Sequence, residues 1–346
     1  MKLLVTGGAG FIGSNFVRYY LCRHPGDTII NLDKLTYAGN LENLSEVERH
    51  PRYRFVKGDI CDGPLVADLF EAERPETVVH FAAESHVDRS ILAPSPAFET
   101  NLRGTFTLLE AARQFKVARF VHISTDEVYG SLEPPLEADE GFPLKPSSPY
   151  SAAKAGSDLL ALSFFTTYQA PVVVTRASNN YGPYQFPEKL IPLLMTNALE
   201  DRPLPIYGDG RQIRDWLYVE DHCAAVEAVV AAGRPGEIYN IGGNCSLENR
   251  AVARQILELA GRPESLLQSV ADRPGHDRRY ALSSGKIERE LGWSPRVDFA
   301  AGLAQTMEWY RSHGGWLGRV RDGEYRKYYE QNYGNRPCAS PSTPHL

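Results

Sequence analysis

The chain has 346 residues, of which 42% are hydrophobic and 23% charged, and its formal net charge is -6. This mild acidity argues against a nucleic-acid-binding surface, because such surfaces are generally basic. The longest apolar runs, such as residues 224–232, are too short to span a bilayer, and the amino terminus leads directly into an expected strand without a basic leader. The five cysteines show no paired spacing, which fits reduced thiols and predicts no metal site. We expect a cytoplasmic protein without membrane partners.

The first half of the chain alternates short β-branched runs with segments of helical length. The expected strands are residues 2–6, 28–32, 53–57, 77–81, 119–124 and 171–178, and a long helix is expected over 150–168. Such alternation predicts an α/β fold with a doubly wound parallel Rossmann sheet covered by helices on both faces. Beyond Asn179 the chain becomes rich in proline and aromatic residues, with helices expected over 190–199 and 221–232. This change predicts a smaller, mostly C-terminal α/β lobe.

The same change in composition predicts two domains. Residues 1–178, rejoined by about 216–245, form the expected cofactor domain. Residues 179–215 and 246–336 form the expected substrate domain, and residues 337–346 have the composition of an unstructured tail.

The segment TGGAGFIGSN places Gly7, Gly10 and Gly13 between the first expected strand and a helix. Glycine lets the backbone approach a pyrophosphate closely, and a helix N-terminus offers it free N–H groups. Asp33 ends the second expected strand twenty residues after Gly13, where a carboxylate can bind both ribose hydroxyls and repel a 2′-phosphate. The sequence therefore predicts a dinucleotide site that favours NAD over NADP.

Two further motifs carry proton-transfer groups. YSAAK puts Tyr150 and Lys154 on one face of a helix, where the ammonium and a nicotinamide ring would favour the phenolate. STDEVYG places Asp126 and Glu127 side by side where a buried strand ends. On its own such a pair is usually a solvated turn. Beside the ligand-binding edge of a doubly wound sheet it instead faces the reacting groups.

These motifs carry a resemblance to known families. The glycine spacing and YSAAK resemble the extended short-chain dehydrogenase/reductase superfamily. More narrowly, the chain from residue 1 to about 337 is similar to the dTDP-glucose 4,6-dehydratase family, through the segments STDEVYG, AAESHVDRS, NLRGT, RASNNYGPYQFPEKLIP, GDGRQIRDWLYVEDH, IYNIGG and DRPGHDRRYALSSGKIERELGW.

The resemblance implies conversion of dTDP-glucose to dTDP-4-keto-6-deoxyglucose and water, with NAD regenerated after it has carried a hydride from C4 to C6. Tyr150, assisted by Lys154, takes the C4 hydroxyl proton, and Thr125 hydrogen-bonds the same oxygen. Glu127 then removes the C5 proton. Asp126, its pKa raised by burial and by Glu127, protonates the departing C6 hydroxyl.

The resemblance also implies binding residues. For the cofactor these are Gly7, Gly10, Phe11, Ile12, Gly13, Asp33, Lys34, Thr36, Asp59, Ile60, Phe81, Ala82, Ala83, Ser85, Thr100, Tyr150, Lys154 and Asn179. For the nucleotide sugar they are Ser85, His86, Thr125, Asn179, Glu188, Lys189, Leu190, Pro205, Tyr207, Arg214, Asn249, Arg273, His276 and Tyr280, with the two arginines on the diphosphate.

A homodimer is also expected. The expected helices over 97–115 and 150–168 carry apolar residues on more than one face, and the resemblance implies that they pair two subunits. The residues concerned include Leu108, Leu109, Leu159, Leu162 and Phe165.

Two alternatives stay open. The nearer one is a different enzyme on the same fold: a UDP- or CDP-glucose 4,6-dehydratase, or a sugar-nucleotide 4-epimerase or decarboxylase. The Asp126–Glu127 pair argues against the epimerase and the decarboxylase, whereas the choice of nucleotide depends on the resemblance alone. The more distant alternative is a non-catalytic NAD-binding regulator.

Overall fold

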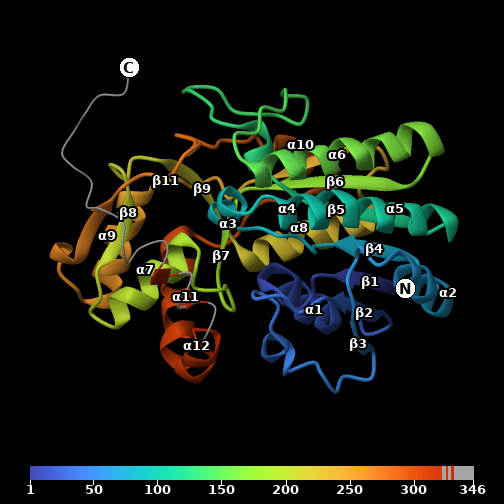
Figure 1. Ribbon diagram of the computed structural model, residues 1–346, viewed down its shortest axis with the longest axis horizontal. Helices are drawn as coiled ribbons and strands as arrows, with labels where there is room; N and C mark the ends of the chain where they lie inside the picture. Colours follow the sequence, from blue (N-terminus) through green and yellow to red (C-terminus); the bar gives the residue numbers. More distant parts are fainter. Residues whose placement is uncertain (322–324, 326–328, 331–346) are drawn as a thin grey trace.

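The computed structural model describes residues 1–321, 325, 329 and 330. The expected tail over 337–346, and part of 322–336 in the expected substrate domain, lie outside the described residues. A large sheet with its helices occupies one end of the molecule, and a smaller group of strands and helices occupies the other (Figure 1).

The large sheet has seven strands in the order β10-β6-β5-β4-β1-β2-β3, and every neighbouring pair is parallel. The strands are β1 (Lys2–Thr6), β2 (Thr28–Asp33), β3 (Tyr53–Lys57), β4 (Thr77–His80), β5 (Arg119–Thr125), β6 (Val172–Ala177) and β10 (Ile238–Ile241). This order confirms the predicted doubly wound fold. Six strands lie within one residue of their expected bounds at each end, while β10 was not predicted as a strand.

Helices cover both faces of this sheet because successive strand residues point to opposite sides. Leu3 and Val5 face one core with α1 (Phe11–Arg23) and α8 (Val219–Ala232). Leu4 faces the other core, with the helices α2 (Gly63–Glu73), α5 (Thr105–Gln114) and α6 (Pro149–Tyr168).

The single helix expected over 97–115 is three elements in the structure. α4 (Ser95–Phe98) continues into a π-helical segment (Glu99–Gly104), which continues into α5. In the π-helical segment, the buried Asn101 side chain accepts from Glu84 N–H and donates to Glu84 C=O, both at 2.9 Å. The wider turn thus accompanies a side-chain bond to the loop after β4, and π-helical turns occur often at functional sites.

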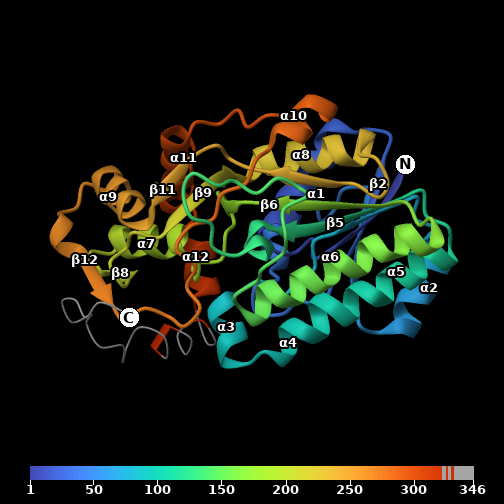
Figure 2. The same cartoon turned by 90° about the horizontal axis from the view of Figure 1, so that it is seen from above.

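The smaller end is built on two short sheets. One holds β7 (Asn179–Tyr181), β9 (Ile213–Tyr218) and β11 (Ser246–Glu248), and the other holds β8 (Leu204–Tyr207) and β12 (Leu267–Val270). The helices there are α7 (Leu190–Leu199), α9 (Asn249–Ala260), α11 (Phe299–Ser312) and α12 (Gly314–Val320), while α10 (Gly285–Leu291) lies near α8 (Figure 2). Within the described residues, no helix combines the length and the apolarity needed to cross a membrane.

Candidate active site

A tight glycine turn joins β1 to α1. Gly7 has a φ of 73°, and a Cβ at this position would lie 2.5 Å from Ala82 N, so only glycine fits there. A Cβ on Gly13 would collide with the carbonyl oxygen of Gly7. The helix starts after Gly10 without a side-chain cap, and residues Gly10 to Gly13 line a cavity. These features fit the pyrophosphate of a dinucleotide.

The loop after β2 forms the next wall of this cavity. Asp33 is buried at the end of β2 and accepts from Ala9 N–H at 2.9 Å and from Leu35 N–H at 2.8 Å. Burial raises the pKa of Asp33, while the two backbone bonds oppose the rise. Lys34 and Asp59, which also line the cavity, form an ion pair at 2.6 Å. The loop therefore presents a carboxylate at the position that a dinucleotide-binding sheet uses for the ribose hydroxyls.

The two adjacent carboxylates lie where β5 ends. A short 3₁₀ turn (Asp126–Tyr129) follows the strand, and Thr125 caps it by accepting from Glu127 N–H at 3.3 Å. The Thr125 hydroxyl donates to Asp126 Oδ1 at 3.3 Å, whereas Asp126 Oδ2 is buried without a hydrogen-bond partner among the described residues. Asp126 and Glu127 both line the first cavity, so this strand end is part of the site and not a solvated surface turn.

The surroundings raise the pKa of both carboxyl groups. Burial raises the pKa of Asp126 well above its ordinary value, and the charges of Glu127 and Asp215 add to this effect. Burial also raises the pKa of Glu127, but the cations Arg273 and Lys189 oppose the rise. The pair is therefore suited to hold a proton on Asp126 while Glu127 stays available as a base.

Tyr150 and Lys154 lie in the first turns of α6. Ser148 and Ser151 form a capping box that fixes the start of this helix, and Tyr150 N–H donates to Ser90 Oγ at 3.2 Å. Lys154 Nζ donates to Ile123 C=O at 2.7 Å, and burial lowers the pKa of Lys154 to about 8. The side chains of both residues line the same cavity as the two carboxylates.

The acidity expected for Tyr150 is not present in the protein alone. Burial raises the pKa of Tyr150, the charge of Glu127 raises it further, and a hydrogen bond with Thr125 only partly opposes them. The prediction assigned the acidity to Lys154 and a nicotinamide ring together, and in the protein alone burial and the neighbouring carboxyl groups oppose it. The reason is that the phenol is buried beside two carboxyl groups, which the spacing of YSAAK could not reveal.

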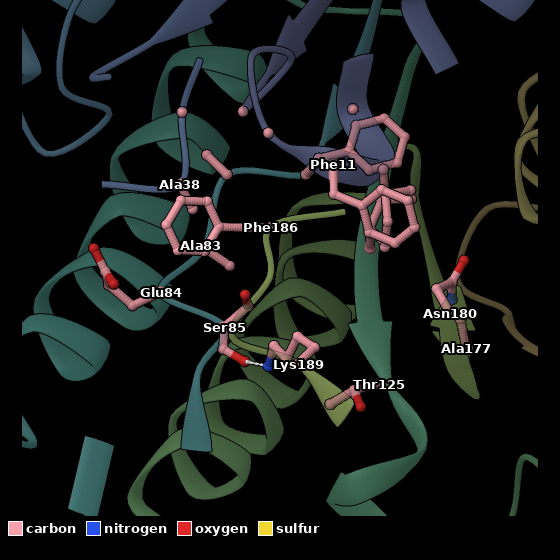
Figure 3. Close-up of a pocket in the computed structure, with 18 of the residues that line it drawn as sticks. Phe11, Ala38, Ala83, Glu84, Ser85, Thr125, Ala177, Asn180, Phe186 and Lys189 are labelled. Atoms are coloured by element: carbon pink, nitrogen blue, oxygen red, sulfur yellow. Dashed lines mark hydrogen bonds between the residues drawn. The ribbon is translucent and has the colours of Figure 1, made fainter. Parts of the chain in front are cut away.

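A second cavity adjoins the first at the smaller end of the molecule. Glu127, Asn179, Glu188, Lys189 and Leu190 line both cavities. In Figure 3 Lys189 and Ser85 point toward one another, and Lys189 Nζ donates to Ser85 C=O at 2.5 Å. Because Glu127 lines both cavities, ligands bound in the two cavities would both contact it.

Two arginines that line the second cavity, Arg214 and Arg273, are held in place by hydrogen bonds. Asp88 Oδ1 accepts from Arg273 Nη1 and Asp88 Oδ2 from Tyr207 OH, both at 2.7 Å. Burial acts to raise the pKa of Asp88, but Arg273 outweighs it and the pKa is lowered to about 2. Arg214 donates to Asp277 C=O at 2.9 Å and lies 4.1 Å from the centre of the Tyr280 ring. Fixed guanidinium groups of this kind suit a diphosphate.

The structure brings the sequence-predicted residues together. Every residue predicted for the cofactor, from Gly7 to Asn179, lines the first cavity, as do Thr125, Asp126 and Glu127. Of the residues predicted for the nucleotide sugar, Ser85 and Thr125 line the first cavity, and the others line the second: His86, Asn179, Glu188, Lys189, Leu190, Pro205, Tyr207, Arg214, Asn249, Arg273, His276 and Tyr280.

Sequence reasoning missed several residues that support this site. Trp216 lines both cavities, His222 lines the first and Asp88 the second. Tyr37 and Arg89 contact Glu188 from outside the predicted set. The run VDRS at residues 87–90, with two opposite charges beside a predicted binding segment, was the available signal for Asp88 and Arg89.

Comparisons with known proteins show what the chain is similar to. The family model for GDP-mannose 4,6 dehydratase matches residues 4–306. The chain is 51% identical to dTDP-glucose 4,6-dehydratase from Salmonella typhimurium, over 97% of this chain and 100% of the relative. It is 53% identical to dTDP-glucose 4,6-dehydratase from Actinoplanes sp., over 91% of this chain and 99% of that relative.

Solved structures give the same result. A dTDP-glucose 4,6-dehydratase from Streptomyces venezuelae with NAD bound is 54% identical, with a TM-score of 0.90, and the match covers 92% of this chain and 100% of that chain. A UDP-glucose 4-epimerase from Thermus thermophilus in complex with NAD is 34% identical with a TM-score of 0.84, over 90% of this chain and 100% of that chain. The fold is shared with epimerases, but the higher identity is to dehydratases. This chain therefore belongs to the dTDP-glucose 4,6-dehydratase family.

Proposed function

We propose that this protein converts dTDP-glucose to dTDP-4-keto-6-deoxyglucose and water. The observation that carries the proposal is the position of Asp126 and Glu127. These adjacent carboxyl groups, of which Asp126 is buried and Glu127 partly buried, share the first cavity with Tyr150 and Lys154, and Glu127 also reaches the second cavity. The elimination of water across C5 and C6 needs an acid and a base at one place, next to a group that can first oxidise C4.

Oxidation at C4 uses the residues at the start of α6. Tyr150 takes the proton of the C4 hydroxyl, Thr125 hydrogen-bonds the same oxygen, and the Lys154 ammonium stabilises the phenolate. NAD, when bound in the first cavity, stores the hydride between the oxidation of C4 and the reduction of C6. Because burial and Glu127 raise the pKa of Tyr150, the positive charge that makes this phenol a base has to come largely from the bound cofactor.

Elimination uses the two carboxyl groups. The C4 ketone makes the C5 proton acidic, Glu127 removes this proton, and Asp126 protonates the C6 hydroxyl, which leaves as water. When hydride reaches C6, Glu127 would return a proton to C5, so at the end of the cycle Tyr150 is protonated and Asp126 is not. The Thr125 hydroxyl hydrogen-bonds both groups and so offers a path that returns the proton to Asp126.

The binding roles follow the two cavities. We assign the cofactor to the first cavity, with Asp33 favouring NAD over NADP, and the nucleotide sugar to the second. Arg214 and Arg273 hold the diphosphate, since hydrogen bonds already orient their guanidinium groups, with Arg214 buried and Arg273 partly buried. Ser85 and Glu188 face the glucose, and Pro205 to Tyr207 lie along the base.

The decisive experiment incubates the purified protein with dTDP-glucose, UDP-glucose, CDP-glucose or GDP-mannose and measures the alkali-induced absorbance of a 4-keto sugar. We expect the signal with dTDP-glucose in the wild type and its loss in Asp126→Asn. Formation of UDP-galactose from UDP-glucose, without a 4-keto product, would instead identify a 4-epimerase.

Three further assignments belong to this proposal. We propose a cofactor domain of residues 1–178 and about 216–245, supported by β10, which completes the large sheet, and by α8, which packs on α1. Residues 179–215 and 246–336 form the proposed substrate domain. We also propose a homodimer through α4, α5 and α6, supported by exposed apolar side chains there. A cytoplasmic location is proposed as well, supported by the four free cysteines among the described residues.

A further inference from the structure

Tyr37 lies on the loop that frames the cofactor cavity, four residues after Asp33. Its neighbours Lys34, Thr36, Ala38 and Gly39 line that cavity. The phenol hydroxyl, however, donates to Glu188 Oε1 at 2.9 Å, across 151 residues of sequence. The cofactor loop thus makes a direct bond to a residue that lines both cavities.

Glu188 receives bonds on both of its carboxylate oxygens. Oε1 accepts from Tyr37, and Oε2 accepts from Arg89 Nε at 3.1 Å. The Arg89 guanidinium carbon lies 3.7 Å from the centre of the Tyr37 ring, so the three side chains close a triangle. The Glu188 side chain is only 2% exposed. A buried carboxylate is retained only where donors and cations satisfy it, so Tyr37 and Arg89 fix both its charge and its orientation.

We propose that Tyr37 is a positioning residue that couples the cofactor site to the sugar site through Glu188. The inference depends on the proposed function, in which Glu188 faces the glucose. A cofactor that orders the loop at Asp33 also orders Tyr37, and Tyr37 then holds Glu188 as an acceptor for sugar hydroxyls. Such coupling is reciprocal, so a bound sugar also tightens binding of the cofactor, which we expect to appear as slower release.

Tyr37→Phe tests this inference in the holoenzyme because it removes one hydroxyl. It keeps the ring above which Arg89 lies and the edge contact with Phe186, whose ring centre is 5.6 Å away. We expect the KM for dTDP-glucose to rise on the order of 10-fold, the size expected for losing a hydrogen bond to a charged group. The value of kcat should change less, and inhibition by dTDP, which lacks the glucose, should stay unchanged.

The release rate of NAD gives a second test, because a purely structural role of Tyr37 would not make this rate depend on the sugar. In the wild type, dTDP-glucose should slow the release of NAD, and Tyr37→Phe should lose this effect. Tyr19→Phe is the matched control, because Tyr19 OH donates to Glu227 Oε2 at the same 2.9 Å distance but away from both cavities. The control should leave the KM and the NAD release rate unchanged.

Glu188→Gln provides an independent variant should Tyr37→Phe fold poorly. The Glu188→Gln and Tyr37→Phe effects on KM should be less than additive in the double variant, since both act on one bond. An unchanged KM and an unchanged NAD release rate in Tyr37→Phe, with an active wild type, would overturn the inference. A wild type that does not turn over dTDP-glucose would instead refute the proposed function.

Discussion

Asp126 and Glu127 illustrate how a residue pair can serve chemistry at the expense of stability. Asp126 is 3% exposed, one carboxylate oxygen has no hydrogen-bond partner among the described residues, and a second carboxyl group is its neighbour in sequence. Burial of an unpaired carboxylate is unfavourable, so the group resists ionisation instead. A carboxylic acid that keeps its proton near neutral pH is the group that a departing hydroxyl needs.

This cost predicts a pH-dependent gain in stability for Asp126→Asn. An unfolded aspartate has a pKa of about 3.9, and burial raises the pKa of Asp126 well above this value in the folded state. Between the two pKa values the folded protein binds the extra proton, so the wild type loses stability as the pH rises through this window. Because asparagine carries no such cost, the variant should melt higher than the wild type by roughly 2 °C or more at pH 8.

The control and the pH series decide the cause of that gain. The difference in melting temperature should shrink as the pH falls toward 4, since the unfolded wild type then begins to bind the proton as well. Asp68→Asn, on the exposed face of α2, should show neither effect. A melting difference that is the same at both pH values would point to packing and not to ionisation.

Substitutions of Glu127 and Tyr150 should block different steps of the reaction. The glutamine in Glu127→Gln cannot accept the C5 proton, so elimination should slow by roughly 10²- to 10⁴-fold while oxidation continues. Reduced nicotinamide absorbance should then build up on adding substrate. Tyr150→Phe should block the oxidation itself.

In D2O the wild-type product should carry deuterium at C5 and none at C6, whereas substrate deuterated at C4 should give product deuterated at C6. Solvent deuterium at C6 would contradict the assignment.

At the scale of elements, the short helix α3 (Val87–Leu92) joins three parts of the site. Asp88 holds Arg273 and Tyr207, Arg89 holds Glu188, and Ser90 Oγ accepts from the N–H of Tyr150 at the start of α6. Three consecutive residues therefore fix the second cavity, the shared wall and the catalytic helix relative to one another.

Asp88→Asn tests this role of α3. The amide keeps the shape of the side chain but leaves the partly buried Arg273 without its counter-charge, so the guanidinium loses its fixed position toward the diphosphate. We expect the KM for dTDP-glucose and the inhibition constant for dTDP to rise together, by roughly 10-fold or more. Asp209→Asn, which breaks the exposed ion pair with Arg278, should change neither constant. Unchanged binding in Asp88→Asn would show that Arg273 needs no such support.

The sequence predicted the elements whose signals are local. The strands from β1 to β6 are β-branched runs between turns, and the glycine turn and the end of β5 follow directly from them. The segment from Glu99 to Gly104 was predicted as α-helix because apolar spacing cannot distinguish a π-helical turn. The bonds of Tyr37 to Glu188 and of Asp88 to Arg273 join positions 151 and 185 residues apart, and no pattern within a segment reports such contacts.

At the scale of the whole molecule, several large apolar side chains are exposed on one side. α4 and α5 follow one another along it, and α6 lies beside them (Figure 2). Their large exposed apolar side chains are Phe98 (56%), Phe106 (47%), Leu159 (59%) and Tyr168 (53%). Leu108 and Leu109, which the sequence offered for this surface, are instead buried in the core under α5. The pattern of α5 alone could not show which of its apolar faces meets the sheet.

This apolar side predicts the assembly state. A second copy of the chain can cover it with the same helices, and each large side chain removed from water contributes about 1.5 to 3 kcal/mol. The sedimentation mass at micromolar concentration should therefore be twice the 38.5 kDa of one chain. In such a symmetric interface a substitution is present in both subunits. Leu159→Glu should therefore raise the dissociation constant of the dimer by roughly two orders of magnitude. Leu259→Glu, at an exposed leucine on α9, should leave the dimer intact. If the wild type sediments as a single chain, the predicted homodimer is wrong and this apolar side is not covered by a second copy.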